Sequence, residues 1–166
     1  SILPIVLKIF QIIFDRGPLF FKQKRVGQNG KIFTIYKFRT LKGNFSAEKY
    51  NVVGKYDEEA HKKDFENRLT KFGQFLRKTN LDEYPQFINV LLGDMSVVGP
   101  RPILISSDHQ LSSQIPKYKL RTFLKPGVTG WAQVCGHRGF GKNHNNIKKR
   151  PDLDIFYLEN WPLFFD

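Results

Sequence analysis

The chain has 166 residues, a length that suits one domain with its own hydrophobic core. Its 27 Lys and Arg residues exceed its 15 Asp and Glu residues, and the net charge of +12 predicts an anionic partner: nucleic acid, nucleotide phosphates or an acidic membrane surface. The single cysteine, Cys135, excludes an internal disulfide and a cysteine-rich zinc site, and the four histidines have no metal-binding spacing.

Residues 1–14 are almost wholly apolar, although Pro4, Lys8 and Gln11 interrupt the run. The run is shorter than the roughly 20 residues that a helix needs to cross a bilayer. It also lacks the basic start and the small-residue cleavage site of a secretory signal. We expect an interfacial or re-entrant helix, or the tail of a longer membrane segment; an ordinary amphipathic core helix is the alternative.

A β-hairpin is predicted next. Residues 19–24 and 31–40 have strand character, and the Asn-Gly pair at 29–30 favours a tight turn between them. Lys37 and Arg39 fall on the same face of the second strand. Together they could hold a phosphate, or they could form the solvated edge of a half-buried strand.

Two helices are expected after a loop over residues 42–56. Residues 57–69 carry the mixed charges of a solvent-facing helix, and residues 71–78 form a short amphipathic helix. The second helix should turn three apolar side chains inward: Phe72, Phe75 and Leu76.

An adjacent pair of carboxylates, Asp82 and Glu83, follows these helices, with Arg77 before it and Arg101 after it. Two acids between two arginines favour phosphate chemistry, because guanidinium groups bind phosphate and carboxylates serve as nucleophiles or metal ligands. Arg101 lies between two prolines that fix its backbone, which suits a forked contact with a phosphate or a carboxylate. A structural pairing of Arg101 with Asp94 is the alternative.

A helix is predicted over residues 85–92. Because Pro85 has no N–H and is tolerated only in the first turn, the helix should begin near Asn80 to Asp82. Both carboxylates would then lie at its N-terminus, where the macrodipole favours their ionised form. Alternatively, Asn80 and Glu83 form an N-cap with its capping-box partner, and Asp82 only complements the dipole. The helix carries one apolar stripe at helical spacing: Phe87, Ile88, Leu91 and Leu92.

The remaining chain predicts an extended segment over residues 95–98 and helical structure over 103–124 that restarts at Pro116. Residues 136–143 miss the P-loop pattern, and a loop that lends Arg138 or Lys142 to an anionic ligand is expected instead. The aromatic C-terminal stretch after Asp152 is expected to dock at a membrane or to pack in the core.

Four stretches together resemble the bacterial sugar transferases, also called small monotopic phosphoglycosyl transferases. They are residues 17–40, 69–102, 124–139 and 154–166. This ordered set is more specific than any one motif, and it favours a catalytic over a merely capping role for the carboxylates. The expected fold is a single compact α+β domain over residues 1–166, with a β-hairpin and several amphipathic or interfacial helices. It would be monotopic and membrane-associated, with residues 1–14 as the remnant of a truncated re-entrant helix.

The resemblance implies transfer of a sugar 1-phosphate from a UDP-sugar to polyprenyl (undecaprenyl) phosphate, with release of UMP, at the cytoplasmic face of the bacterial membrane. Such a reaction initiates exopolysaccharide, capsule or other glycoconjugate assembly. Asp82 matches the family's nucleophile, which holds the phosphosugar covalently. Glu83 would be a base or a Mg²⁺ ligand, and both acids are candidate metal ligands. UDP-glucose or UDP-galactose is the expected donor.

Arg77 and Arg101 match the family's phosphate-binding arginines. Further candidate binding residues are Lys37, Arg39, Gln133 and Arg138. The competing class is a non-enzymatic basic protein that binds RNA or anionic lipid. That class does not explain an acidic pair between arginines, and the sequence has no nucleic-acid-binding signature, so we expect no nucleic-acid partner.

Overall fold

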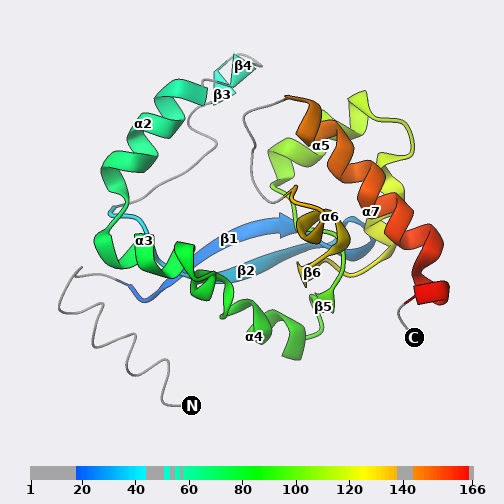
Figure 1. The fold of residues 1–166 in the computed structure, drawn as a ribbon, viewed down its shortest axis with the longest axis horizontal. Coiled ribbons are helices and arrows are strands. Elements are labelled where there is room, and N and C mark those ends of the chain that lie inside the picture. The colour runs from blue at the N-terminus through cyan, green and yellow to red at the C-terminus, as the bar shows by residue number, and fades with distance from the viewer. Residues whose placement is uncertain (1–17, 44–50, 53–54, 57, 138–143, 165–166) are drawn as a thin grey trace. The chain divides into compact units, whose positions relative to one another are not determined.

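The computed structural model describes residues 18–43, 51–52, 55–56, 58–137 and 144–164 (Figure 1). Within them, helices and strands are mixed, as the sequence predicts. The chain forms two compact units: residues 1–21 with 36–85, and residues 22–35 with 86–166. The helix expected over residues 1–14 lies outside the described residues.

The predicted β-hairpin is confirmed. Strands β1 (Phe20–Val26) and β2 (Ile32–Phe38) pair in a two-stranded sheet, visible as the blue arrows of Figure 1. The 3-10 turn η1 (Gln28–Gly30) joins them, with φ of 53° at Asn29 and 77° at Gly30. Asparagine and glycine tolerate positive φ better than other residues, which is why this pair marks the turn.

The first unit contains the two predicted helices, α2 (Glu58–Arg68) and α3 (Lys71–Lys78). Strands β3 (Asn51–Val52) and β4 (Lys55–Tyr56), which precede these helices in the chain, pair antiparallel. These four residues fall in the segment predicted as a loop, so that prediction is wrong for them.

The start of helix α3 is hydrogen-bonded to the backbone of Thr40, which lies just after β2. Its cap residue Thr70 donates to the Thr40 carbonyl through both its N–H (3.1 Å) and its hydroxyl (3.3 Å), and its Oγ1 accepts the N–H of Gly73 (2.8 Å). A Cβ added at Gly73 would overlap the Thr40 carbonyl. Only glycine therefore lets the helix come this close.

The core of the first unit is formed by Phe38 and Leu76, with Leu19, Phe72 and Leu81 packed against them. Phe75, which was expected inward, is 52 % exposed. Gly73 and Leu76 define the buried face of α3. Phe75 lies about 200° around the helix from Gly73, because successive residues are about 100° apart.

The second unit contains the remaining elements. They are α4 (Gln86–Leu91), β5 (Ser96–Val98), α5 (Ile105–Gln114), η4 (Tyr118–Phe123), β6 (Gly127–Thr129), α6 (Trp131–Val134) and α7 (His144–Phe164). The predicted extended segment becomes β5, which pairs parallel with β6. The predicted helical stretch is interrupted around Pro116 as expected, but its second half is a 3-10 helix. Among the described residues, no helix is both long and apolar enough to cross a membrane.

Helix α4 buries polar residues and exposes its apolar stripe. Asn89 is 0 % exposed; its Nδ2 donates to the Thr34 carbonyl at 2.8 Å, and its own carbonyl accepts the N–H groups of Asp94 and Met95. Gln86, one turn earlier, is also buried. The stripe is exposed at all four positions, Phe87, Ile88, Leu91 and Leu92. An amphipathic helix usually buries its apolar face, but this short helix is oriented by the hydrogen bonds of Asn89.

A buried ion pair connects elements of the second unit. Arg121 on η4 donates from Nη2 to Asp154 Oδ2 on α7 at 2.6 Å and to the carbonyl of Arg101 at 2.8 Å. The side chains of Arg121 and Asp154 are almost fully buried. One hydrophobic cluster of this unit comprises Phe33, Ile35 and Met95, with Val90 and Val128 packed against them.

We predict that Gly73→Ala lowers the free energy of unfolding by about 1–3 kcal/mol, because the added methyl group must displace the Thr40 backbone. In an unconstrained helix the same change would stabilise by about 0.5–1 kcal/mol, so the sign is diagnostic. Denaturant titration measures the change. Gln74→Ala, on the exposed side of α3, is the matched control and should stay within about 0.5 kcal/mol of the wild type. A stabilised Gly73→Ala variant would contradict the close approach.

Candidate active site

The carboxylate pair lies on a separate turn, not in the first turn of α4. Asp82 and Glu83 belong to the 3-10 turn η3 (Leu81–Glu83), and α4 begins only at Gln86. Asn80, which precedes the turn, adopts a left-handed conformation (φ 57°) and its side chain makes no capping hydrogen bond. A helical turn therefore does begin at Leu81, within the predicted range of Asn80 to Asp82, but it is a separate 3-10 turn, so the prediction of one continuous helix is wrong. The capping-box alternative is also wrong, because Asn80 does not cap the turn.

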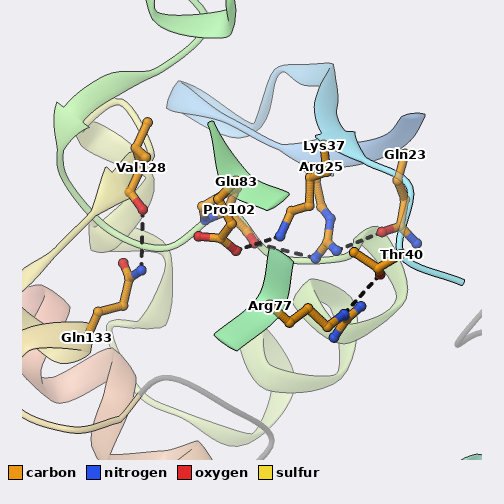
Figure 2. Close-up of polar contacts among 9 residues, drawn as sticks. All are labelled: Gln23, Arg25, Lys37, Thr40, Arg77, Glu83, Pro102, Val128 and Gln133. Carbon is orange, nitrogen blue, oxygen red and sulfur yellow. Dashed lines mark hydrogen bonds and ion pairs between the residues drawn. The ribbon is translucent and has the colours of Figure 1, made fainter. Parts of the chain in front are cut away.

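Glu83 is paired with Lys37 instead. The Nζ of Lys37, on β2, lies 2.7 Å from Glu83 Oε1, and both side chains are largely buried (Figure 2). The structure thus brings together two of the predicted site residues from positions 46 apart in the chain. In this partly buried setting the pair restrains both side chains more strongly than a surface ion pair would.

Arg39, predicted to act beside Lys37, contacts backbone. Its Nε donates to the carbonyl of Pro18 at 2.9 Å and its Nη1 to that of Leu41 at 3.4 Å. Lys37 and Arg39 therefore bond to different partners. A direct contact of either one with phosphate stays a prediction.

Arg77 lies in the last turn of α3 and is held from two sides. Its Nε donates to Thr40 Oγ1 at 2.9 Å, a contact drawn in Figure 2. Its guanidinium carbon lies 4.5 Å from the centre of the Phe65 ring, on α2. Such a stack provides a favourable cation–π contact. The sequence predicted neither partner of Arg77. Thr40 is only the last residue of the stretch 17–40 that resembles the family, and Phe65 lies in a helix that was expected simply to face solvent.

Asp82 is only 8 % exposed, and burial raises the pKa of its carboxyl above the ordinary 3.8. Lys37 lowers this pKa, Glu83 raises it and Arg77 lowers it, but desolvation is the largest effect and the net direction is upward. The sequence had predicted that a helix dipole would favour the ionised form. Desolvation is the larger effect because removing the carboxylate from water costs more free energy than its attraction to Lys37 and Arg77 provides.

Two other candidates, Arg101 and Gln133, belong to the second unit. Arg101 follows a close crossing between residues 99–100 and strand β6, in which the N–H of Gly99 donates to Thr129 O and the N–H of Gly127 donates to Pro100 O, each at 2.9 Å. A Cβ on Gly127 would overlap the backbone of Gly99. The glycines thus let the loop that carries Arg101 pack directly on the β6 strand.

Gln133 is buried on α6, and its Nε2 donates to the Val128 carbonyl at 3.3 Å (Figure 2). Its Oε1 is buried without a hydrogen-bond partner among the described residues. Arg138 lies outside the described residues. A common site for Asp82, Arg101, Gln133 and Arg138 stays a prediction.

The two adjacent carboxylates, Asp82 and Glu83, are the candidate ligands for a Mg²⁺ ion. The described part of the chain contains no cluster of three or more His, Cys, Asp or Glu side chains that could enclose a metal ion. Mg²⁺ does not require such a cage, because it usually takes one or two carboxylates, waters and substrate phosphates. Asp82 and Glu83 fit that arrangement.

We predict that Asp82→Asn raises thermal stability at neutral pH. An upward-shifted pKa means that the folded state binds a proton more tightly than the unfolded state, so ionisation of Asp82 costs stability as the pH rises. Asparagine removes that cost. The advantage of the variant should shrink as the pH falls through the raised pKa and vanish below about 3.8, where the wild-type carboxyl is protonated in both states. Thermal unfolding from pH 3 to 8 measures it.

The exposed Asp152 supplies the control for this experiment. Asp152→Asn should change the melting temperature little across the range. If Asp82→Asn were less stable than the wild type at neutral pH, the cations around Asp82 would outweigh its burial, opposite to the balance described above.

Comparison with known proteins places these features in a family. The family described as bacterial sugar transferase matches residues 1–166. The chain is 43 % identical, over 150 residues, to the UDP-glucose:undecaprenyl-phosphate glucose-1-phosphate transferase of Escherichia coli K12, covering 90 % of this chain and 30 % of that protein. A Klebsiella pneumoniae protein of the same name is 42 % identical over 167 residues, which are 98 % of this chain and 34 % of that protein.

A third relative carries a different sugar in its name. The UDP-N-acetylgalactosamine-undecaprenyl-phosphate N-acetylgalactosaminephosphotransferase of Aeromonas hydrophila is 37 % identical over 150 residues, covering 90 % of this chain and 33 % of that protein. The chain thus spans about a third of the length of these relatives. Its four motif stretches and the match over its full length establish that the chain belongs to the bacterial sugar transferase family.

Proposed function

We propose that this chain is the catalytic portion of an enzyme that transfers a sugar 1-phosphate from a UDP-sugar to polyprenyl phosphate through a covalent aspartyl phosphosugar. The relatives named above act, by their names, on UDP-sugars and undecaprenyl phosphate. The observation that carries the proposal is the setting of Asp82: a buried carboxylate next to Glu83, with Lys37 and Arg77 as the cations acting on it.

In the first step, a carboxylate oxygen of Asp82 attacks the sugar-linked phosphorus of the donor. A bond forms between that oxygen and the phosphorus, and the bond from the phosphorus to the bridging diphosphate oxygen breaks. UMP leaves with that oxygen and its electron pair. A carboxylate with little hydration is better able to attack phosphorus than one surrounded by water. Arg77 supplies positive charge toward the phosphate oxygens.

In the second step, an oxygen of polyprenyl phosphate attacks the same phosphorus. The bond from the phosphorus to Asp82 breaks, which restores the carboxylate and yields the polyprenyl diphosphate sugar. Glu83, whose Oε1 lies 2.7 Å from Lys37 Nζ, would accept a proton from an incoming monoprotonated phosphate.

Asp82 and Glu83 would hold Mg²⁺ together with donor phosphate oxygens. Bound there, the ion would supply positive charge that offsets the charge of the diphosphate and of the departing UMP. In its absence two carboxylates and a diphosphate would repel one another. Lys37 offsets part of that repulsion through its ion pair with Glu83.

The donor we propose is a UDP-hexose, with UDP-glucose or UDP-galactose first, and the acceptor lies in the cytoplasmic leaflet of the bacterial membrane. The chain's charge of +12 suits both an anionic donor and an anionic lipid surface. The product would start the assembly of a polysaccharide or another glycan.

We predict that the full-length protein, incubated with Mg²⁺ and a UDP-sugar but no lipid acceptor, gains the mass of one sugar phosphate and releases one UMP. Intact mass spectrometry across a panel of UDP-sugars identifies the donor, and polyprenyl phosphate should then discharge the adduct. Asp82→Asn should form no adduct and lose turnover by about 10⁴-fold or more, as removal of a nucleophile does in other enzymes. Chelation of Mg²⁺ should also prevent the adduct.

Asp152→Asn, at an exposed acid, is the matched control and should form the adduct normally. Turnover without any adduct, retained in Asp82→Asn, would indicate direct transfer without this nucleophile. If no donor were turned over while RNA or anionic vesicles bound equally to the wild type and to Asp82→Asn, the non-enzymatic alternative would replace the proposal.

A further inference from the structure

Arg77 is a surface residue whose side chain makes specific contacts within the first unit. It is exposed in the last turn of α3, where a long arginine side chain normally samples many rotamers. Two contacts restrict it here: the hydrogen bond from its Nε to Thr40 Oγ1 at 2.9 Å and the stack of its guanidinium on Phe65 at 4.5 Å. The hydrogen bond holds the Nε edge of the guanidinium, and the ring contact holds its central carbon over Phe65.

Thr40 is itself held rigidly. Its side chain belongs to a residue only 5 % exposed, and its carbonyl accepts two hydrogen bonds from Thr70 at the start of α3. Gly73, one turn further, packs against the same carbonyl. Helix α3 therefore meets Thr40 at its cap, at its middle and, through Arg77, at its last turn. The hydroxyl that receives Arg77 is thus fixed relative to the whole helix.

Phe65 is anchored through its own helix. Arg68, in the last turn of α2, donates to Asp64 at 2.7 Å, and its carbonyl accepts the N–H of Lys42 at 2.8 Å. These contacts connect the end of α2 to the segment that follows Thr40. The ring and the hydroxyl that hold Arg77 therefore belong to one connected piece of the first unit.

From these contacts we propose that Thr40 and Phe65 are positioning residues that preorganise Arg77 to bind a phosphate of the nucleotide diphosphate donor. The inference rests on the proposed function, in which Arg77 faces the donor beside Asp82. A guanidinium already held by these two contacts loses little freedom when it binds, so more of the contact energy is available to hold the phosphate. Without the two contacts, Arg77 would still carry its charge but would have to be ordered by the substrate.

The test is the rate of adduct formation with UDP-sugar and Mg²⁺, measured on the full-length protein as a second-order rate constant. Thr40→Val removes the hydroxyl at nearly constant shape and should lower the constant about five- to ten-fold. Thr40→Ser keeps the hydroxyl and should restore it to within about two-fold. Phe65→Leu should lower it about three-fold, while Phe65→Tyr keeps the ring and should stay near the wild type.

A double-mutant cycle separates positioning from a general structural role. If Thr40 acts through Arg77, Thr40→Val should change the rate by less than about two-fold in an Arg77→Ala background. Equal losses in both backgrounds, or a Thr40→Val variant as fast as the wild type, would overturn the inference. Slow variants are followed over hours in the same mass assay, so a residual rate can be compared.

A second readout does not depend on activity. In protein labelled with ¹⁵N-arginine, the Nε–H signal of Arg77, identified by its loss in Arg77→Lys, should exchange with solvent faster in Thr40→Val than in the wild type or in Thr40→Ser. Unchanged exchange would overturn the inference directly. If the wild type formed no adduct with any donor, the proposed function would fail; adduct formation that Thr40→Val leaves unaffected would count against this inference alone.

Discussion

The contact between helix α3 and the backbone of Thr40 is the constraint on which the first unit depends. One carbonyl receives the helix cap, excludes any side chain at Gly73 and lies beside the hydroxyl that binds Arg77. Helix α3 in turn leads into η3, and the two pack together. The position of the carboxylate pair therefore follows from how closely one helix approaches one strand end, and a glycine makes that approach possible.

The electrostatics of Asp82 result from opposing effects. Burial raises the pKa of its carboxyl, while Lys37 and Arg77 lower it. A group held in an environment unfavourable to its charge destabilises the fold, and such groups are concentrated at functional sites. The same burial removes water from the carboxylate, which is the property that a nucleophile for phosphorus requires. Stability and reactivity thus depend on the same feature in opposite directions.

Much of the fold could be predicted from local patterns. The hairpin, α2, α3 and β5 lie where periodicity and turn residues place them, because these signals act between near neighbours in the chain. The prediction for the helix after Pro85 was less successful. Its apolar stripe is exposed because Asn89 hydrogen-bonds to Thr34, a partner 55 positions away that no local pattern contains. The capping-box interpretation failed for a similar reason, since Glu83 pairs with Lys37 on a strand.

By itself, the sequence determined the family, the carboxylate pair and the flanking arginines, because these are chemical identities at recognisable spacings. It also determined the basic charge of the chain. Only the tertiary structure decided that Lys37 forms an ion pair with Glu83 and that Asp82 has a raised pKa. It also decided that Thr40 and Phe65 contact Arg77. Desolvation and long-range contacts depend on which segments pack together, and the local sequence around a residue does not indicate which distant residue it will contact.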